Sequence, residues 1–277
     1  MPERPSGPRL PLEPVLSPSR AADFMQCPLL FRFRTVDRLP EEPKPAAVRG
    51  TLVHAVLDDV FSLAPEERTP DSALAMVEPR WDVMVGESPE FEDMFDSLED
   101  LDAWLEDART LVRRYFEMEH PGRVEPRERE LRLDVTLESG LRLRGYVDRL
   151  DVAPNGAMRV VDYKTGKAPP PRFTDKARFQ IYFYALMIWR VYGEIPRRLQ
   201  LMYLGDSGWL WYEPTEGELR AAEVEIQGIW EAIEATARSG EWPAKPSKLC
   251  GWCDHQAHCP EFGGTPPPLP TPEATPN

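Results

Sequence analysis

Hydrophobic positions change their spacing along the chain, and these changes separate helical from extended segments. Between Asp71 and about Glu119, apolar residues recur every three or four positions, which predicts helices. From Arg129 to Val147 the spacing becomes two, with a turn at Ser139-Gly140, which predicts antiparallel strands. A further strand is predicted from Met158 to Lys164, because a turn signal precedes it.

Helix caps and a second pair of apolar runs predict the remaining elements. Ser17-Pro18 is a typical helix start, and the helix is expected to run toward Cys27-Pro28. The other expected elements are a helix from after Gly50 to near Ser62, a helix from Thr174 or Asp175 to about Tyr192, a strand pair at Leu199–Leu204 and Trp209–Tyr212, and a last helix at Thr215–Ser239. This order predicts an α/β fold with a mixed central sheet flanked by helices.

Length and composition fit one globular domain with appendages. The 277 residues are 42% hydrophobic, which is enough for a full core. We expect a single domain over residues 17–263 with an acidic helical insertion at 71–120, and disordered proline-rich ends at 1–16 and 264–277. No apolar run approaches the roughly 20 residues that span a membrane, and the start lacks a signal-peptide core. A cytoplasmic location is expected.

The formal net charge of −14 argues at first against a nucleic-acid partner, because phosphate binding usually leaves a basic surface. Between Arg80 and Arg109, however, eleven Asp and Glu residues occur without any Lys or Arg. Most of the negative charge therefore lies in one segment. This segment is either a solvated helical face or a surface that binds a partner or mimics DNA.

Two aspartates and a lysine form the main candidate for chemistry. Asp148 lies near the end of one expected strand, and Asp162 follows the apolar pair Val160-Val161 on the next. Lys164 is two residues further, so its side chain shares a strand face with Asp162. Carboxylates on rigid strands can hold a divalent cation, and a nearby lysine can stabilise charge on an attacked phosphate. The alternative is a structural Asp162–Lys164 ion pair.

The four cysteines form a second group. Cys250, Cys253 and Cys259 are closely spaced, and Cys27 is the only other cysteine. A C-x2-C pair in a cytosolic chain indicates metal ligation or redox chemistry more than disulfides. Four thiolates can hold either zinc or an iron–sulfur cluster, and the spacing does not distinguish them. His255 and His258 could substitute as ligands, although such residues are more often bystanders.

Several short blocks, taken together and in order, resemble the RecB-like branch of the PD-(D/E)XK nucleases, which includes the CRISPR adaptation nucleases and AddB-type subunits. The resemblance extends over most of the chain. The blocks are Leu16-Ser17-Pro18-Ser19-Arg20 with Cys27-Pro28, Arg49 to His54, Gly145 to Asp151, Val161 to Gly166, Gln180 to Tyr184, and Cys250 to Cys253 with Cys259-Pro260.

The resemblance implies a restriction-endonuclease-like fold and assigns roles at the catalytic centre. By this likeness, His54, Asp148 and Asp162 hold Mg²⁺ or Mn²⁺, with the Tyr163 carbonyl as a further ligand, and Lys164 is the catalytic lysine. Neutral imidazole is a plausible ligand for Mn²⁺ and a less usual one for Mg²⁺. Considered without the family, His54 is better explained as a packed or capping histidine.

Three other residues belong to this picture with open alternatives. Gln180 and Tyr184 share a helix face that, by the resemblance, lies against DNA near the catalytic centre. Ordinary helix packing is the alternative for both. Glu130, at the start of the first strand, could help orient the site, but it is better explained as a solvent-facing strand residue.

The resemblance also favours one metal group for the cysteines. Family members with one early cysteine and a late triplet look like the iron–sulfur subgroup, which implies a [4Fe–4S] cluster on Cys27, Cys250, Cys253 and Cys259, with Zn²⁺ as the alternative. Such a cluster would connect the N-terminal helix to the C-terminal loop.

These expectations converge on a metal-dependent DNA nuclease, in particular an exonuclease acting on single-stranded or frayed ends with a metal-activated water. The alternative is a non-catalytic DNA-binding or scaffolding subunit of a repair complex. The chain has no G-x-x-x-x-G-K-[ST] phosphate loop. Any unwinding would therefore need a separate helicase or repair partner.

Overall fold

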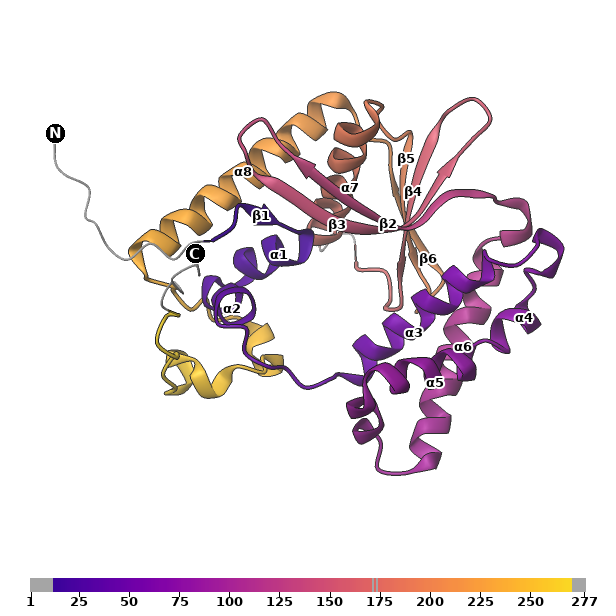
Figure 1. Ribbon diagram of the computed structural model, residues 1–277, viewed down its shortest axis with the longest axis horizontal. Helices are drawn as coiled ribbons and strands as arrows, with labels where there is room; N and C mark the ends of the chain where they lie inside the picture. Colours follow the sequence, from indigo (N-terminus) through magenta and orange to yellow (C-terminus); the bar gives the residue numbers. More distant parts are fainter. Residues whose placement is uncertain (1–11, 171, 173, 271–277) are drawn as a thin grey trace, which may run out of the picture. The chain divides into compact units, whose positions relative to one another are not determined.

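The computed structural model describes residues 12–170, 172 and 174–270, and it contains the α/β architecture that the sequence predicts (Figure 1). The helices are α1 Pro18–Gln26, α2 Pro28–Phe31, α3 Pro45–Val60, α4 Pro70–Leu74, α5 Val77–Glu87, α6 Leu98–Met118, α7 Asp175–Tyr192 and α8 Glu216–Ser239. The strands are β1 Val15–Leu16, β2 Pro126–Thr136, β3 Arg142–Val152, β4 Met158–Lys164, β5 Arg198–Tyr203 and β6 Gly208–Tyr212. None of the helices in these residues has the length and apolar character needed to cross a bilayer.

Two element boundaries differ from the sequence expectations for local reasons. Helix α3 begins at Pro45, with Lys44 at the N-cap, and not after Gly50. Proline suits the first turn because its missing N–H has no helical partner there, and Gly50 lies within the helix. Strand β1, Val15–Leu16, lies within the segment 1–16 that the composition predicts to be disordered. Residues 1–11 and 271–277 lie outside the described residues.

The chain divides into two compact units, each built from separate parts of the sequence. The first consists of residues 1–42, 134–145 and 217–277, and the second of residues 43–133 and 146–216. The acidic helical segment thus belongs to the second unit together with β4, β5 and β6. The expected single domain over residues 17–263 stays a prediction.

The first unit joins the two ends of the described chain. Ser17 caps α1 by accepting a hydrogen bond from the Arg20 backbone N–H. The Leu29 backbone N–H donates to the Pro243 carbonyl over 3.3 Å, and the Phe31 and Trp242 rings stack 5.8 Å apart. These contacts hold α1 and α2 beside the yellow C-terminal segment in Figure 1.

The second unit contains a mixed sheet in the order β3-β4-β5-β6, with β2 also paired to β3. The β3–β4 and β5–β6 pairs are antiparallel, whereas β4 and β5 run parallel. Residues paired across adjacent strands lie on the same face. Val161 and Tyr163 therefore face one side of the sheet, and Asp162 and Lys164 face the other.

The two faces of this sheet are covered by different helices. One hydrophobic cluster combines Val161, Tyr163 and Met202 with buried residues of α3, α5 and α6. Helix α7 packs against β5 and carries Gln180, which contacts Lys164 on the opposite face. The alternation along β4 thus places apolar side chains under α3 and α6 and polar ones toward α7.

A buried arginine ties β3 and β4 to α6. Arg149, 1% exposed, forms ion pairs with Glu119 over 2.7 Å and with Asp151 over 3.0 Å. It also donates to the Tyr163 hydroxyl over 2.8 Å and to the Tyr115 hydroxyl over 3.2 Å. The carboxylates and hydroxyls together satisfy a charge that would be costly to bury alone.

We expect Arg149→Met to lower the free energy of unfolding by about 3 kcal/mol, because it leaves buried carboxylates short of a positive partner. Urea denaturation followed by circular dichroism measures this loss. Arg113→Met is the matched control, since Arg113 pairs with the exposed Glu106 and such pairs contribute about 0–1 kcal/mol. Equal losses in the two variants would show that the buried network does not stabilise the fold.

Candidate active site

The antiparallel pairing of β3 and β4 brings the two predicted aspartates to one end of the strand pair. Arg149 pairs with Val161, so Asp148 and Asp162 each lie one residue from that pair in the direction of the same end. The Tyr163 backbone N–H donates a 2.6 Å hydrogen bond to Asp148 Oδ2. The strand backbone therefore fixes the Asp148 carboxylate directly, as expected for a rigid site.

A compact group of potential metal ligands forms around Asp148. Ligand atoms of His54, Glu130 and Asp148 all lie within 4.8 Å of one another, and this is the only such group of three or more His, Cys, Asp and Glu in the described part of the chain. His54 extends from α3, with its Nδ1 3.4 Å from Asp148 Oδ1. Its ring meets the Tyr163 ring edge-on at 5.9 Å. The predicted pair of His54 and Asp148 thus lies together.

Glu130 enters this group through an unusual backbone conformation. Its φ of +43° lies in the left-handed region, which residues other than glycine seldom adopt. This conformation interrupts the regular alternation of β2 and lets the side chain join His54 and Asp148. The sequence placed Glu130 at the start of a strand but gave no signal for a positive φ, so its participation was left open.

Asp162 makes a different contact from the one expected of a direct ligand. Its Oδ2 lies 2.7 Å from Lys164 Nζ, and Asp162 is not a member of the His54–Glu130–Asp148 group. Lys164 Nζ also donates to Gln180 Oε1 over 3.1 Å, and Gln180 Nε2 donates to the Tyr184 hydroxyl over 3.4 Å. The four predicted residues Asp162, Lys164, Gln180 and Tyr184 therefore form one chain of contacts.

Crowded carboxylates raise the pKa values of their neighbours. Burial, followed by the Asp148 carboxylate, raises the pKa of Asp162, although Lys164 opposes the shift. Partial burial and then Asp148 likewise raise the pKa of Glu130. Burial acts to lower the pKa of His54, but the hydrogen bond and charge of Asp148 outweigh it and the pKa is raised. The site thus holds more negative charge than its own cations balance.

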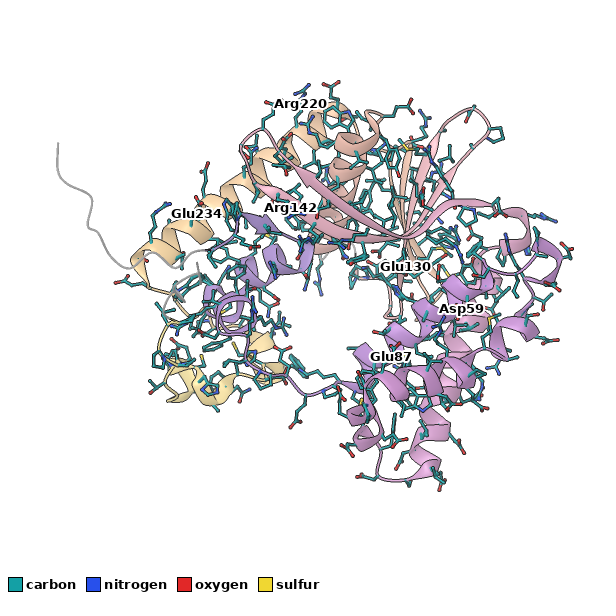
Figure 2. The ribbon with its side chains drawn as sticks, viewed as in Figure 1. Asp59, Glu87, Glu130, Arg142, Arg220 and Glu234 are labelled. Atoms are coloured by element: carbon teal, nitrogen blue, oxygen red, sulfur yellow. The ribbon has the colours of Figure 1, made fainter. Side chains whose placement is uncertain are left out.

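A cleft of about 570 Å³ opens beside the ligand group, lined by one side of α3 and by Arg80, Glu130 and Thr165. Figure 2 labels Glu130 on β2 and Asp59 near the end of α3. Gly50 faces this cleft, and a Cβ there would lie 3.4 Å from Thr165 Oγ1. This is an ordinary van der Waals separation, so α3 lies close to the loop that follows β4 without requiring glycine at this position.

The donor set fits a hard divalent cation. One imidazole and two carboxylates match the preferences of Mn²⁺ and, with water completing the shell, of Mg²⁺. Asp162 supports the fit, because it is 3% exposed, and burial followed by the Asp148 carboxylate raises its pKa even though Lys164 lies 2.7 Å from its Oδ2. A cation would compensate the repulsion among the carboxylates.

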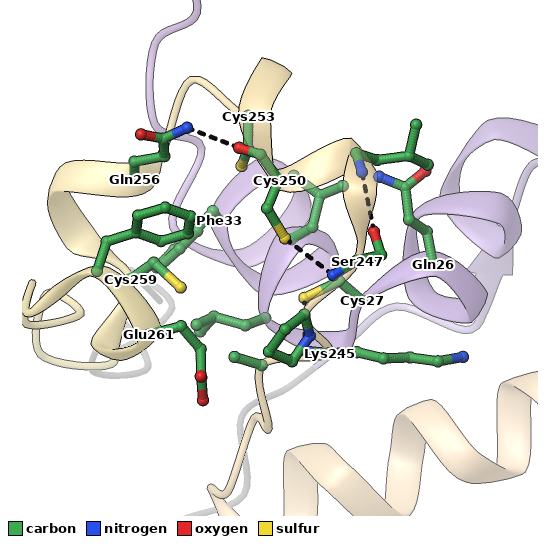
Figure 3. Close-up of a pocket in the computed structure, with 16 residues that line it drawn as sticks. Gln26, Cys27, Phe33, Lys245, Ser247, Cys250, Cys253, Gln256, Cys259 and Glu261 are labelled. Atoms are coloured by element: carbon green, nitrogen blue, oxygen red, sulfur yellow. Dashed lines mark hydrogen bonds between the residues drawn. The ribbon is translucent and has the colours of Figure 1, made fainter.

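The four cysteines line one small pocket in the first unit (Figure 3). Cys250 Sγ accepts a hydrogen bond from the Ser247 backbone N–H over 3.3 Å, and Cys27 Sγ accepts one from Lys245 over 3.4 Å. Within the described segments, no three of the sulfur atoms lie within 4.8 Å of one another. The four thiols line the same pocket, but their sulfur atoms do not form a close group. The expected iron–sulfur cluster is therefore not shown.

The two histidines of the cysteine segment have other partners. The ring nitrogen Nε2 of His255 lies 2.7 Å from Glu41 Oε1, and the ring packs on Phe33 with centroids 5.3 Å apart. The His258 ring packs on Phe33 from 6.2 Å. Neither contact places a histidine among the sulfur atoms.

Comparison with known proteins gives concordant results. Residues 15–260 match the family profile of the PD-(D/E)XK nuclease superfamily. The gene 69 protein of Mycobacterium phage D29 is 27% identical over 273 residues, covering 90% of this chain and 97% of that protein. The gene 69 protein of Mycobacterium phage L5 is 33% identical over 137 residues, covering 48% of this chain and 44% of that protein.

A solved structure shares the fold. The crystal structure of a candidate exonuclease from Eubacterium rectale superposes with a TM-score of 0.57 at 16% identity, covering 87% of each chain. Likeness at this identity concerns the fold alone. The AddB-type and iron–sulfur resemblances are not shown by these comparisons.

We expect Glu130→Gln and Asp148→Asn each to weaken Mn²⁺ binding by about tenfold or more, because ligand charge and number set the affinity for hard cations. Isothermal titration calorimetry or the electron paramagnetic resonance signal of unbound Mn²⁺ measures the affinity. Asp82→Asn removes an exposed carboxylate of the acidic segment and should leave it unchanged. Equal losses of Mn²⁺ affinity in all three variants would mean that binding depends only on the total charge of the protein.

Proposed function

Because the chain belongs to the PD-(D/E)XK nuclease superfamily, we propose that it is a DNA nuclease that hydrolyses phosphodiester bonds at the His54–Glu130–Asp148 group. The observation that carries this proposal concerns Lys164 on β4, the strand next to Asp148. Its ammonium contacts both Asp162 of the same strand and Gln180 of α7. Such an arrangement supplies carboxylates for a cation and a fixed ammonium for phosphate in one site. Water adds to phosphorus, and the bond to the leaving ester oxygen breaks.

The protein residues divide the work of this reaction. A cation held by His54, Glu130 and Asp148, with Asp162 as a further carboxylate, would lower the pKa of water and polarise the phosphate. Lys164 offers its ammonium to the negative charge that develops on phosphate oxygens. Gln180 accepts from Lys164 and so limits the positions that the ammonium can take. Tyr184 holds Gln180 in turn.

We further propose that the enzyme acts as an exonuclease on single-stranded or frayed ends. The fold shared with a candidate exonuclease supports this reading, and so does the absence of a phosphate-loop motor in the sequence. Without a motor, the enzyme needs ends that are already open or a helicase partner that opens them. A free single-stranded end can also enter the site without a groove that encloses a duplex.

We expect Lys164→Met and Asp162→Asn to lower DNA cleavage at least about a hundredfold, since preorganised charge of this kind commonly contributes that much or more. End-labelled single-stranded DNA incubated with Mn²⁺ or Mg²⁺ and resolved on denaturing gels measures the rate. Lys248→Met and Asp82→Asn are matched controls at exposed positions and should retain full activity.

Two results would contradict the nuclease proposal. Cleavage that survives both site substitutions would place the reaction elsewhere or in a contaminant. Tight DNA binding with no metal-dependent cleavage of any single-stranded or frayed substrate would favour the non-catalytic scaffold instead. Chelation by EDTA should stop cleavage by the parent protein, and added Mn²⁺ should restore it.

We also propose that Cys27, Cys250, Cys253 and Cys259 bind a [4Fe–4S] cluster. Their shared pocket and the backbone N–H groups directed at two of the sulfur atoms support this assignment. Tetrahedral zinc with Zn–S bonds of about 2.3 Å needs sulfur atoms about 3.8 Å apart, whereas a cluster separates its ligands further. Burial and then the other thiols raise the pKa of Cys253, so a metal is needed to keep it a thiolate.

We expect protein purified without oxygen to be brown and to contain iron, with broad visible absorption that Cys259→Ser reduces. Inductively coupled plasma mass spectrometry measures iron and zinc together. Cys259→Ser changes one of the four proposed ligands, while Ser247→Ala in the same segment keeps them all and should retain the colour. Colourless protein with stoichiometric zinc would overturn the cluster while leaving the nuclease proposal intact.

A further inference from the structure

Strand β6 exposes two tryptophans side by side on one face of the sheet. Trp209 is 40% exposed and Trp211 is 58% exposed, and their two-residue spacing places both rings on the same side. β6 is the last strand in the order of the sheet, so no further strand pairs with its outer edge in the described region. The Arg198 guanidinium lies over the Trp211 ring, 5.2 Å from its centroid. Large exposed aromatic groups of this kind are typical of binding surfaces.

The β5–β6 turn is fastened to the loop that follows Lys164. The Leu204 backbone N–H donates to the Lys164 carbonyl over 2.7 Å, and the Gly205 N–H donates to the Gly166 carbonyl over 3.0 Å. A Cβ at Gly205 would lie 2.5 Å from the Gly166 backbone, so only glycine permits this approach. Arg114 of α6 also donates to the Gly205 carbonyl over 2.6 Å. The tryptophan strand therefore has a fixed place relative to Lys164.

The separation of the tryptophans from the catalytic strand suits a nucleic-acid chain. Trp209 pairs with Met202, which pairs with Tyr163, so two strand spacings, about 10 Å, separate Trp209 from β4. A single strand of a few nucleotides can extend over this distance. Gly208 and Lys164 both pair with Tyr203, so they lie at the same end of the sheet. Trp209 is one residue away from that end. The rings face the side opposite Lys164, so a chain reaching both must pass over that end.

The charge of this region differs from that of the whole protein. Between Tyr163 and Tyr212 the sequence carries eight Lys and Arg residues against three Asp and Glu residues, within a chain of net charge −14. This segment includes β5 and β6 together with α7. This part of the sequence therefore repels a polyanion less than the acidic segment does.

We propose that Trp209 and Trp211 form a stacking surface for the bases of single-stranded nucleic acid that extends from the catalytic site. This inference rests on the proposed nuclease function and adds the substrate form that the enzyme prefers. Unpaired bases stack on exposed aromatic rings, whereas bases in a duplex are already stacked on each other. The Arg198 guanidinium lies over the Trp211 ring and also pairs with Glu213 over 3.5 Å, so it holds the ring in place.

Binding of a fluorescein-labelled single-stranded oligodeoxynucleotide tests the proposal. Lys164→Met protein is used as the parent so that the probe is not cut, and fluorescence anisotropy gives its Kd. Trp209→Ala and Trp211→Ala should each raise Kd by about fivefold or more, the factor expected for loss of one stacked base. Trp211→Phe should restore much of the affinity because it keeps a ring. Trp252→Ala, at an exposed tryptophan in the first unit, should have no effect.

An abasic oligomer with the same number of phosphates separates stacking from charge. Its Kd should be nearly the same for the parent and both alanine variants. Unchanged binding of the normal oligonucleotide by the alanine variants would overturn the proposal, and so would an equal loss for the abasic oligomer. Sedimentation that changes with these variants while oligonucleotide affinity does not would assign the surface to contacts between copies.

Failure here and failure of the nuclease proposal are distinguishable, because binding is measured without cleavage. Wild-type protein that cleaves DNA while the tryptophan variants bind normally would reject the stacking surface alone. Wild-type protein that binds through these tryptophans without cutting would reject the catalytic proposal alone.

Discussion

Mutual repulsion among carboxylates is the constraint around which the second unit is organised. Asp148 and Asp162 share one end of the β3–β4 pair, Glu130 joins them from β2, and burial raises the pKa values of Asp162 and Glu130. The fold answers this cost with groups on three different elements. The Tyr163 N–H binds Asp148, Lys164 pairs with Asp162, and His54 approaches from α3. The compensation is incomplete, and that incompleteness makes the site a receptor for a cation.

On the other face of β3 and β4, the two strands are held by paired charges. Arg149 is adjacent to Asp148 but points to the other face, where its charge is matched by Glu119 and Asp151. The Tyr163 ring joins the two faces, since its hydroxyl accepts from Arg149 and its edge packs on His54. A network of paired charges on one face thus supports a group with excess negative charge on the other, as expected where function needs fixed geometry.

Sequence patterns predicted most of the elements because period and turn chemistry are local properties. The strand carrying Asp162 and Lys164 was placed correctly at Met158–Lys164, and the start of α7 was placed within one residue. Features that depend on distant contacts were missed. Gly50 resembles a helix boundary but lies within α3, and the positive φ of Glu130 has no signature in a strand pattern. Strand β1 is two residues long, too short for any period to identify.

The charge of the protein limits how it can attract nucleic acid. Several arginines are already paired with carboxylates, including Arg49 with Asp107, Arg80 with Asp59 and Arg142 with Asp134. Paired guanidinium groups release few counterions from DNA, so the long-range term that dominates most DNA binding is small here. Affinity must then come from short-range contacts. A bound cation at the carboxylates and base stacking on exposed rings are both of this kind, and neither requires a basic surface. An acidic nuclease built in this way would select ends and unpaired bases more strongly than duplex phosphates.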